Sequence, residues 1–123
     1  MSNIRTIMTA DEYGQALVTF ARQEAQRLVR QNLTRSQIRN IFTEVRKIEA
    51  LWQTNPSKAR RRLEMLKPKL EYQAARERAV QGLARILSEA IDYVDPQQEG
   101  SFQRFMELFE AILAYHRALG GRN

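Results

Sequence analysis

Residues 34–52 read TRSQIRNIFTEVRKIEALW, and this stretch decides the class of fold. Thr34 and Gln37 have the spacing of a capping box, in which two side chains accept hydrogen bonds from free backbone N–H groups at a helix start. The apolar side chains that follow recur at intervals of three and four residues, which places them on one face of a helix. They are Ile38, Ile41, Phe42, Val45, Ile48 and Trp52. The stretch therefore predicts a long helix with one buried face.

Turn signals before and after this stretch predict the neighbouring helices. The series Thr9-Ala10-Asp11-Glu12 is a second capping-box sequence and predicts a helix from there to about Asn32. Its expected inward side chains are Tyr13, Ala16, Leu17, Phe20 and Leu28. Asn55 and Pro56 predict the N-cap and the first residue of a short third helix, which we expect to stop before Pro68.

A fourth helix is predicted from Pro68 toward Tyr93, and residues 95–100 read as a loop. Ser101 is expected to cap a last helix that ends at Gly120. That helix carries apolar side chains over roughly 180° of its circumference, wider than the ~100° stripe of an ordinary surface helix. It is either a central helix surrounded by the others or a helix that shares an interface with another copy or another subunit.

These elements define an all-α fold. No strand-like alternation is sustained, and the 123 residues include only five Gly and three Pro. We predict a compact bundle of five to six helices, with residues 1–123 forming a single domain. Residues 1–8 are expected to be flexible.

Two charged side chains fall on faces that are otherwise apolar. Glu24 lies between Phe20 and Leu28, and Arg76 is in line with Tyr72. Because an unpaired buried charge is costly, we expect Glu24 and Arg76 to pair across the core.

The composition argues against most catalytic chemistry. There is no Cys, and the one His, His116, lies within the apolar stripe of the last helix, where a core or interface role is the usual one. We therefore predict no catalytic residue, no metal site and no cofactor. Asp92, Asp95 and Glu99 leave open a metal-dependent nuclease, although they lack the spacing of a calcium loop. No run of apolar residues has the length of a signal peptide or a membrane span, so we expect a soluble cytoplasmic protein without membrane contact.

The charge is positive and unevenly distributed. The formal net charge is +6, and Arg outnumbers Lys sixteen to four. Residues 1–85 hold 17 basic and 8 acidic side chains, whereas residues 86–123 hold 3 and 6. This asymmetry favours a polyanion on one face and a protein partner on another. The alternative is that the arginines lie on solvent-exposed helix faces and bind no ligand.

The candidate polyanion-binding residues occur in two groups. Arg35, Arg39 and Arg46 project within about 40° of one another at 100° per residue, with Lys47 further round the same helix. Such a line can follow a phosphate backbone, whereas a pocket for one anion would need side chains that converge. The densest group runs from Lys58 to Lys69, where an anion would relieve the repulsion between neighbouring charges.

Three stretches together resemble a known family. They read LTRSQIRNIFTEVRKI over 33–48, LKPKLEYQAAR over 66–76 and FEAILAYHRALGG over 109–121. They resemble the small helical subunit of the Csm effector complex of type III-A CRISPR systems. The resemblance implies a non-catalytic RNA-binding subunit whose copies stack head to tail into the minor filament. That filament lies beside the guide RNA and the target RNA and reaches the large polymerase-like subunit.

The resemblance also implies which residues face RNA. By position these are Arg39, Arg46, Lys47, Lys67, Lys69, Arg76 and Arg78, whereas Glu71 departs from the small apolar residue of the pattern. The complete set of candidate RNA-binding residues is Arg35, Arg39, Arg46, Lys47, Arg60, Arg61, Arg62, Lys67, Lys69, Arg76 and Arg78. The expected partners are guide and target RNA through their backbones, other copies of the chain, the backbone subunits and the large subunit of the complex.

Two further functions stay open. The start of the helix at Thr34 and Gln37, with arginines beyond it, is compatible with a helix-turn-helix DNA-binding protein, although about twenty uninterrupted helical residues are long for that motif. The wide apolar stripe of the last helix is also compatible with a helical protein–protein adaptor whose basic face is incidental.

Overall fold

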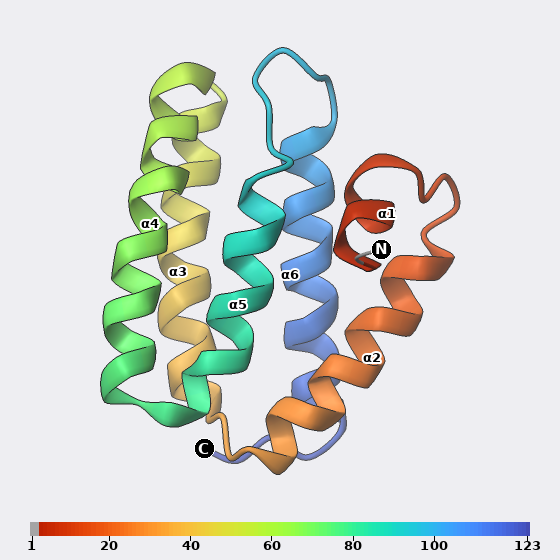
Figure 1. Ribbon diagram of the computed structural model, residues 1–123, viewed down its shortest axis with the longest axis vertical. Helices are drawn as coiled ribbons and strands as arrows, with labels where there is room; N and C mark the ends of the chain where they lie inside the picture. Colours follow the sequence, from red (N-terminus) through yellow and green to blue (C-terminus); the bar gives the residue numbers. More distant parts are fainter. Residues whose placement is uncertain (1–2) are drawn as a thin grey trace.

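The computed structural model describes residues 3–123, and Figure 1 shows that they form helices joined by short connections. No strand occurs within these residues, so the all-α prediction is confirmed. In chain order the elements are α1 (Asn3–Thr9), α2 (Gln15–Arg30), α3 (Arg35–Trp52), α4 (Pro56–Arg76), the 3₁₀-helix η1 (Arg78–Val80), α5 (Gln81–Ile91) and α6 (Ser101–Ala118).

Helix α6 is the centre of the bundle. It packs against α1, α2, α3 and α5, and Figure 1 shows it between the α3–α4–α5 side and the α1–α2 side. Phe105, Met106, Leu108, Phe109 and Ile112 are fully buried. Neighbours on several sides account for its wide apolar arc, so the central-helix interpretation is confirmed.

Helix α3 forms as its sequence predicts. Thr34 Oγ1 accepts from the Gln37 N–H at 3.1 Å, and Gln37 Oε1 accepts from the Thr34 N–H at 2.9 Å. Two aromatic contacts then join α3 to α6. Phe42 meets Phe109 edge-on with ring centroids 5.1 Å apart, and Trp52 stacks on Phe102 at 4.6 Å.

The N-terminal segment differs from the expectation. Residues 3–8, expected to be flexible, form most of α1 and bury Ile4, Ile7 and Met8. Arg104 of α6 donates to the Ile7 carbonyl at 2.9 Å, so the segment is held by polar as well as apolar contacts. Residues 1 and 2 lie outside the described part of the chain.

The start of α2 was also predicted wrongly. Thr9 is the last residue of α1, and α2 begins only at Gln15. The Asp11 carboxylate caps α2 from a distance, accepting from the N–H groups of Ala16 at 3.0 Å and Leu17 at 2.9 Å. Gly14 permits this wider turn because its φ is +79°, and Tyr13, predicted to point inward, lies exposed in the turn.

The boundary predicted at Pro68 does not exist. Pro68 lies inside α4. Because Leu63, Leu66 and Leu70 are buried on both sides of it, their packing keeps the helix intact despite the missing N–H of Pro68. The chain breaks instead at Glu77, whose φ of −124° and ψ of 97° are extended. The Glu77 carboxylate accepts from the side-chain amides of Gln73 at 2.8 Å and Gln37 at 3.2 Å, which anchors the break to α3.

The predicted core pair does not form either. Glu24 pairs with Arg27 at 3.3 Å on its own helix. Arg76 is exposed and lies over the ring of Tyr72 at 5.6 Å. Helices α2 and α4 lie on opposite sides of the molecule in Figure 1, so the two side chains are too far apart to form an ion pair.

The two ends of α6 are fixed by hydrogen bonds. At its start Gly100 is the N-cap, and the Ser101 hydroxyl instead bonds the N–H and the carbonyl of Asp95, each at 2.9 Å. At its end His116 is buried, and its Nε2 donates to the Leu33 carbonyl at 2.7 Å. Gly121 packs against the imidazole, where a Cβ would lie 2.1 Å from the His116 Cε1. His116 therefore has a structural role.

Candidate nucleic-acid interface

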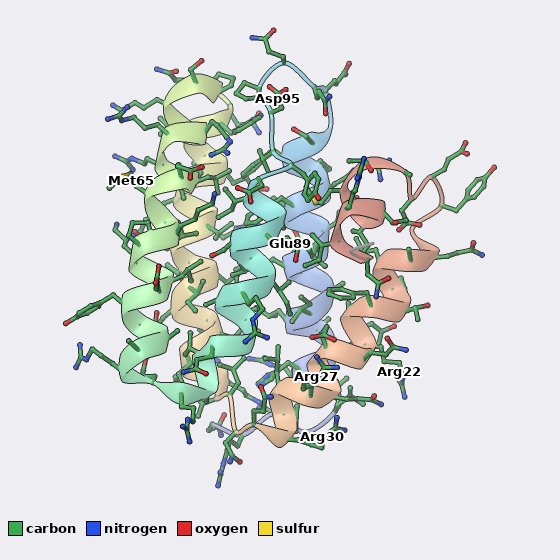
Figure 2. The ribbon with its side chains drawn as sticks, viewed as in Figure 1. Arg22, Arg27, Arg30, Met65, Glu89 and Asp95 are labelled. Atoms are coloured by element: carbon green, nitrogen blue, oxygen red, sulfur yellow. The ribbon has the colours of Figure 1, made fainter. Side chains whose placement is uncertain are left out.

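One line of exposed side chains runs the length of α4. At 100° per residue its members fall within about 80° of one another. We call them the α4 ridge: Lys58, Arg62, Met65, Lys69, Tyr72 and Arg76, all of them exposed. Figure 2 shows Met65 projecting from the side of α4 that faces away from α5 and α6. Arg62, Lys69 and Arg76 follow at intervals of seven residues, or about 10 Å along the axis at 1.5 Å per residue.

The upper part of the ridge borders a groove between α3 and α4. The groove has a volume of about 420 Å³ and is lined by Glu44, Lys47, Ile48, Arg62, Met65, Leu66 and Lys69. The Glu44 carboxylate pairs with the Lys47 ammonium at 3.4 Å and with the Lys69 ammonium at 3.8 Å. These lysines are about two-thirds exposed, with side-chain values of 67% and 68%. Water and salt screen such pairs strongly, so both ammonium groups remain available to an anion.

The other end of the ridge borders a second hollow. Its volume is also about 420 Å³, and its lining is Lys69, Tyr72, Gln73, Arg76 and Glu77. Hydrogen bonds from Gln73 and then Gln37 hold the pKa of the Glu77 carboxyl below its ordinary value. Two cations, an exposed ring and an ionised carboxylate therefore surround this hollow.

A separate cationic strip lies where α3 meets α6. Arg39 is exposed and makes no ion pair or side-chain hydrogen bond with the described residues. Arg46 lies over the ring of Phe42 at 5.8 Å and pairs with Glu49 at 3.4 Å. Arg35, predicted as part of this line, is instead bound to the C-terminal segment: its Nε donates to the Gly121 carbonyl at 2.8 Å. The strip is thus shorter than the sequence predicted.

Two of the predicted RNA-binding residues connect α4 to the end of α5. Arg60 donates to the Val94 carbonyl at 2.7 Å and to Glu64 at 3.0 Å. Lys67 pairs with Asp92 and, at 2.9 Å, with Glu64. Only 22% of the Arg60 side chain and 25% of the Lys67 side chain are exposed. Both side chains are therefore held by partners within the protein.

The same network shifts two pKa values. Asp92, and after it Glu64, raise the pKa of Lys67. Lys67, and after it Arg60, lower the pKa of Glu64. Each shift favours the charged form, so the network is ionised at neutral pH.

The remaining two predicted residues, Arg61 and Arg78, are not members of the α4 ridge. Arg61 is exposed on α4 and borders the ridge, since at 100° per residue it projects about 20° from the direction of Tyr72. Arg78 follows the break at Glu77 and lines a pocket of about 500 Å³ between α2 and α5, together with Arg27 and Arg85. Figure 2 labels Arg27 on the α2 side of this pocket. Arg76 and Arg78 therefore belong to different surfaces, although only one residue separates them.

Sequence reasoning missed three members of the ridge as site residues. Lys58 lies in the dense basic stretch but is not among the candidate residues predicted from the sequence, and neither is Met65. Tyr72 was assigned to an apolar stripe, yet it is 66% exposed. The error arose at Pro68: when the helix that begins at Pro56 is continued through Pro68, helical spacing puts Leu63, Leu66 and Leu70 inward and Tyr72 outward.

Two of the three acidic residues that leave open a metal site, Asp92 and Asp95, have partners within the protein. Asp92 pairs with Lys67, and Asp95 accepts from the Gln97 N–H at 2.8 Å. Within residues 3–123 no group of three or more His, Asp or Glu side chains is placed to hold a metal ion. Among these residues, too, no helix is long and apolar enough to cross a bilayer.

These features define a small helical protein with a linear cationic face and a buried histidine at the end of its central helix. A family model described as Csm2 Type III-A matches residues 11–122, which include all three stretches on which the resemblance rested. The chain therefore belongs to the Csm2 family and is a small subunit of the type III-A CRISPR Csm effector complex. It associates with other subunits of that complex. No curated protein and no solved structure matches the chain.

Proposed function

We propose that this subunit binds the backbone of the target RNA, or of the guide–target duplex, and performs no catalysis itself. The observation that carries the proposal is the α4 ridge, where Arg62, Lys69 and Arg76 are exposed and at most weakly paired with acids. A straight row of cations is complementary to an extended chain of phosphates and reads no base sequence. In such a complex, guide–target pairing supplies the sequence specificity.

Neighbouring surfaces support assembly. The strip with Arg39 and Arg46 extends the positive potential along α3. The exposed acids near the other end of the chain, such as Asp92, Glu107 and Glu110, suit contacts with other copies or other subunits. Stacking would align successive ridges along one RNA, so binding that is weak for one copy becomes strong for a filament. We place this assembly in the cytoplasm.

The helix-turn-helix alternative gains no support from the fold. Helix α3 has 18 residues and α4 has 21. Figure 1 shows the two helices side by side and antiparallel, without a short recognition helix crossing another.

Charge reversal on the ridge tests the proposal. The double variant Arg62→Glu/Lys69→Glu should retain at least tenfold less single-stranded RNA on a filter at low salt, because two phosphate contacts become repulsive. The matched control is Arg30→Glu/Arg85→Glu, which reverses two exposed arginines on α2 and α5. Helix content by circular dichroism should be the same in both. Equal RNA retention by the two variants would contradict the assignment.

A further inference from the structure

The α4 ridge is unusual because it exposes large apolar side chains between its cations. Four large apolar side chains are exposed among the described residues: Tyr13, Val18, Met65 and Tyr72. Two of them lie on the ridge, seven residues apart. A surface that bound only phosphates would need cations alone. Met65 and Tyr72 therefore indicate a ligand with an apolar as well as an anionic part.

Tyr72 is placed to stack on a flat group. Its ring forms one wall of the hollow between Lys69 and Arg76, and the Arg76 guanidinium lies 5.6 Å from the ring centroid. Nucleobases stack on exposed tyrosine rings and on guanidinium planes. Lys69 and Arg76, one turn before and one turn after Tyr72, would contact the phosphates on either side of such a base.

The floor of the hollow offers hydrogen-bond acceptors. Gln73 uses its Nε2 to donate to Glu77 at 2.8 Å, while its Oε1 makes no hydrogen bond with the described residues. Gln37 donates to the other Glu77 oxygen at 3.2 Å, so the carboxylate is fixed in position. A carboxylate repels phosphate but accepts from the N–H groups of a base. The hollow is therefore suited to a base, and the cations beside it to the backbone.

We propose that Tyr72, with Gln73 and Glu77, forms a subsite for an unpaired RNA base. This rests on the proposed function, since it assumes that the α4 ridge is the RNA surface, and it adds that the ridge binds an unpaired strand. Bases within an A-form duplex are stacked on one another and cannot reach the ring.

The test uses the full-length protein and three RNA probes of twelve nucleotides: a single strand containing 2-aminopurine, the same strand with abasic residues, and a duplex. Tyr72→Ala should weaken binding of the intact single strand about tenfold and abolish the quenching of 2-aminopurine fluorescence. Binding of the abasic strand and of the duplex should be unchanged. Tyr72→Phe should behave like the wild type because the ring is retained. Tyr13→Ala, which removes a still more exposed ring on another surface, is the matched control.

The outcomes separate the subsite from the proposed function. If Tyr72→Ala binds all three probes like the wild type, while Arg62→Glu/Lys69→Glu binds none, then the subsite is refuted and the RNA surface stands. If Arg62→Glu/Lys69→Glu also binds like the wild type, the surface itself is wrong and the subsite fails with it. Equal losses on the intact and abasic strands would assign Tyr72 to backbone contact and likewise overturn the subsite.

Discussion

His116 and Gly121 illustrate how single residues hold the end of α6. The buried imidazole donates to Leu33, and Gly121 lies so close to it that no side chain fits. The contact joins the C-terminal segment to the turn between α2 and α3. Arg35 adds a second bond there, from its backbone N–H to the Arg122 carbonyl at 2.7 Å. Because this junction fixes the Nε of Arg35 on the Gly121 carbonyl, we expect Arg35 to contribute less to RNA binding than Arg39 does.

Gly121→Ala should therefore destabilise the protein by about 1–3 kcal/mol, the usual cost of overpacking. Urea unfolding measures the change. The same substitution made in a His116→Ala background should cost at least about 1 kcal/mol less, because the clashing ring is gone. Equal costs in the two backgrounds would show that the ring is not what excludes a side chain at position 121.

The pair of Lys67 and Glu64 predicts a dependence on pH. The pKa of Lys67 is raised, so its contribution is present below about pH 10.5 and is lost as the pH rises above the folded-state pKa. The pKa of Glu64 is lowered, so its contribution to stability is present above about pH 4.5 and is lost as the pH falls below its folded-state pKa. Glu64 is 52% exposed, which limits the gain.

Lys67→Met should accordingly lower the free energy of unfolding by about 0.5 kcal/mol at pH 7. The difference from the wild type should shrink at acid pH, once Glu64 is protonated, and at alkaline pH, once Lys67 loses its proton. Thermal unfolding followed by circular dichroism across this range is the measurement. A difference that stayed constant with pH would mean that Lys67 acts through the packing of its methylene groups.

For whole helices, boundaries set by neighbouring residues were predicted correctly, whereas boundaries set by residues farther along the chain were not. Thr34 and Gln37 lie within one turn, as do Asn55 and Pro56, and both helix starts were correct. The Asp11 cap acts across five and six residues and the packing around Pro68 involves other helices, so neither could be inferred from local spacing. The same limit applies to the candidate site. The density of basic residues indicated the segment that forms α4, but the partners of Arg60 and Lys67 are Val94 and Asp92, which follow α5 and are distant in sequence.

The effect of Pro68 on α4 can be measured by replacing it. Replacing it by Ala restores the N–H that bonds the Glu64 carbonyl and removes a steric clash within α4. Pro68→Ala should therefore stabilise the protein, by about 1 kcal/mol and not the full ~3 kcal/mol of a peptide helix, because Pro also restricts the unfolded chain. The urea midpoint should rise with an unchanged slope. A fall in the midpoint would mean that the bundle requires the shape that Pro68 imposes on α4.

For the whole molecule, the structure divides the cations into those that hold the bundle together and those that are free to bind. Arg60, Lys67 and Arg104 have protein oxygen atoms as partners and are half-buried. Arg62 is exposed and has no acidic partner among residues 3–123, and the exposed Arg76 has only a charge–charge interaction with Glu77. Net charge alone does not distinguish the two groups, since every member adds one positive charge.

Salt dependence does distinguish them. For a single strand, log K falls with log salt concentration with a slope of about −0.7 for each phosphate neutralised. Arg62→Gln should therefore make the slope shallower by about 0.7, and so should Arg76→Gln. Arg60→Gln should lower the unfolding free energy by roughly 1 kcal/mol yet leave the slope unchanged, because its guanidinium is bound to Val94 and Glu64. Fluorescence anisotropy titrations from low to physiological salt give all three slopes. If Arg60→Gln changed the slope as much as Arg62→Gln does, the division between structural and RNA-binding cations would be wrong, and the RNA path would have to extend over the α4–α5 side of the bundle.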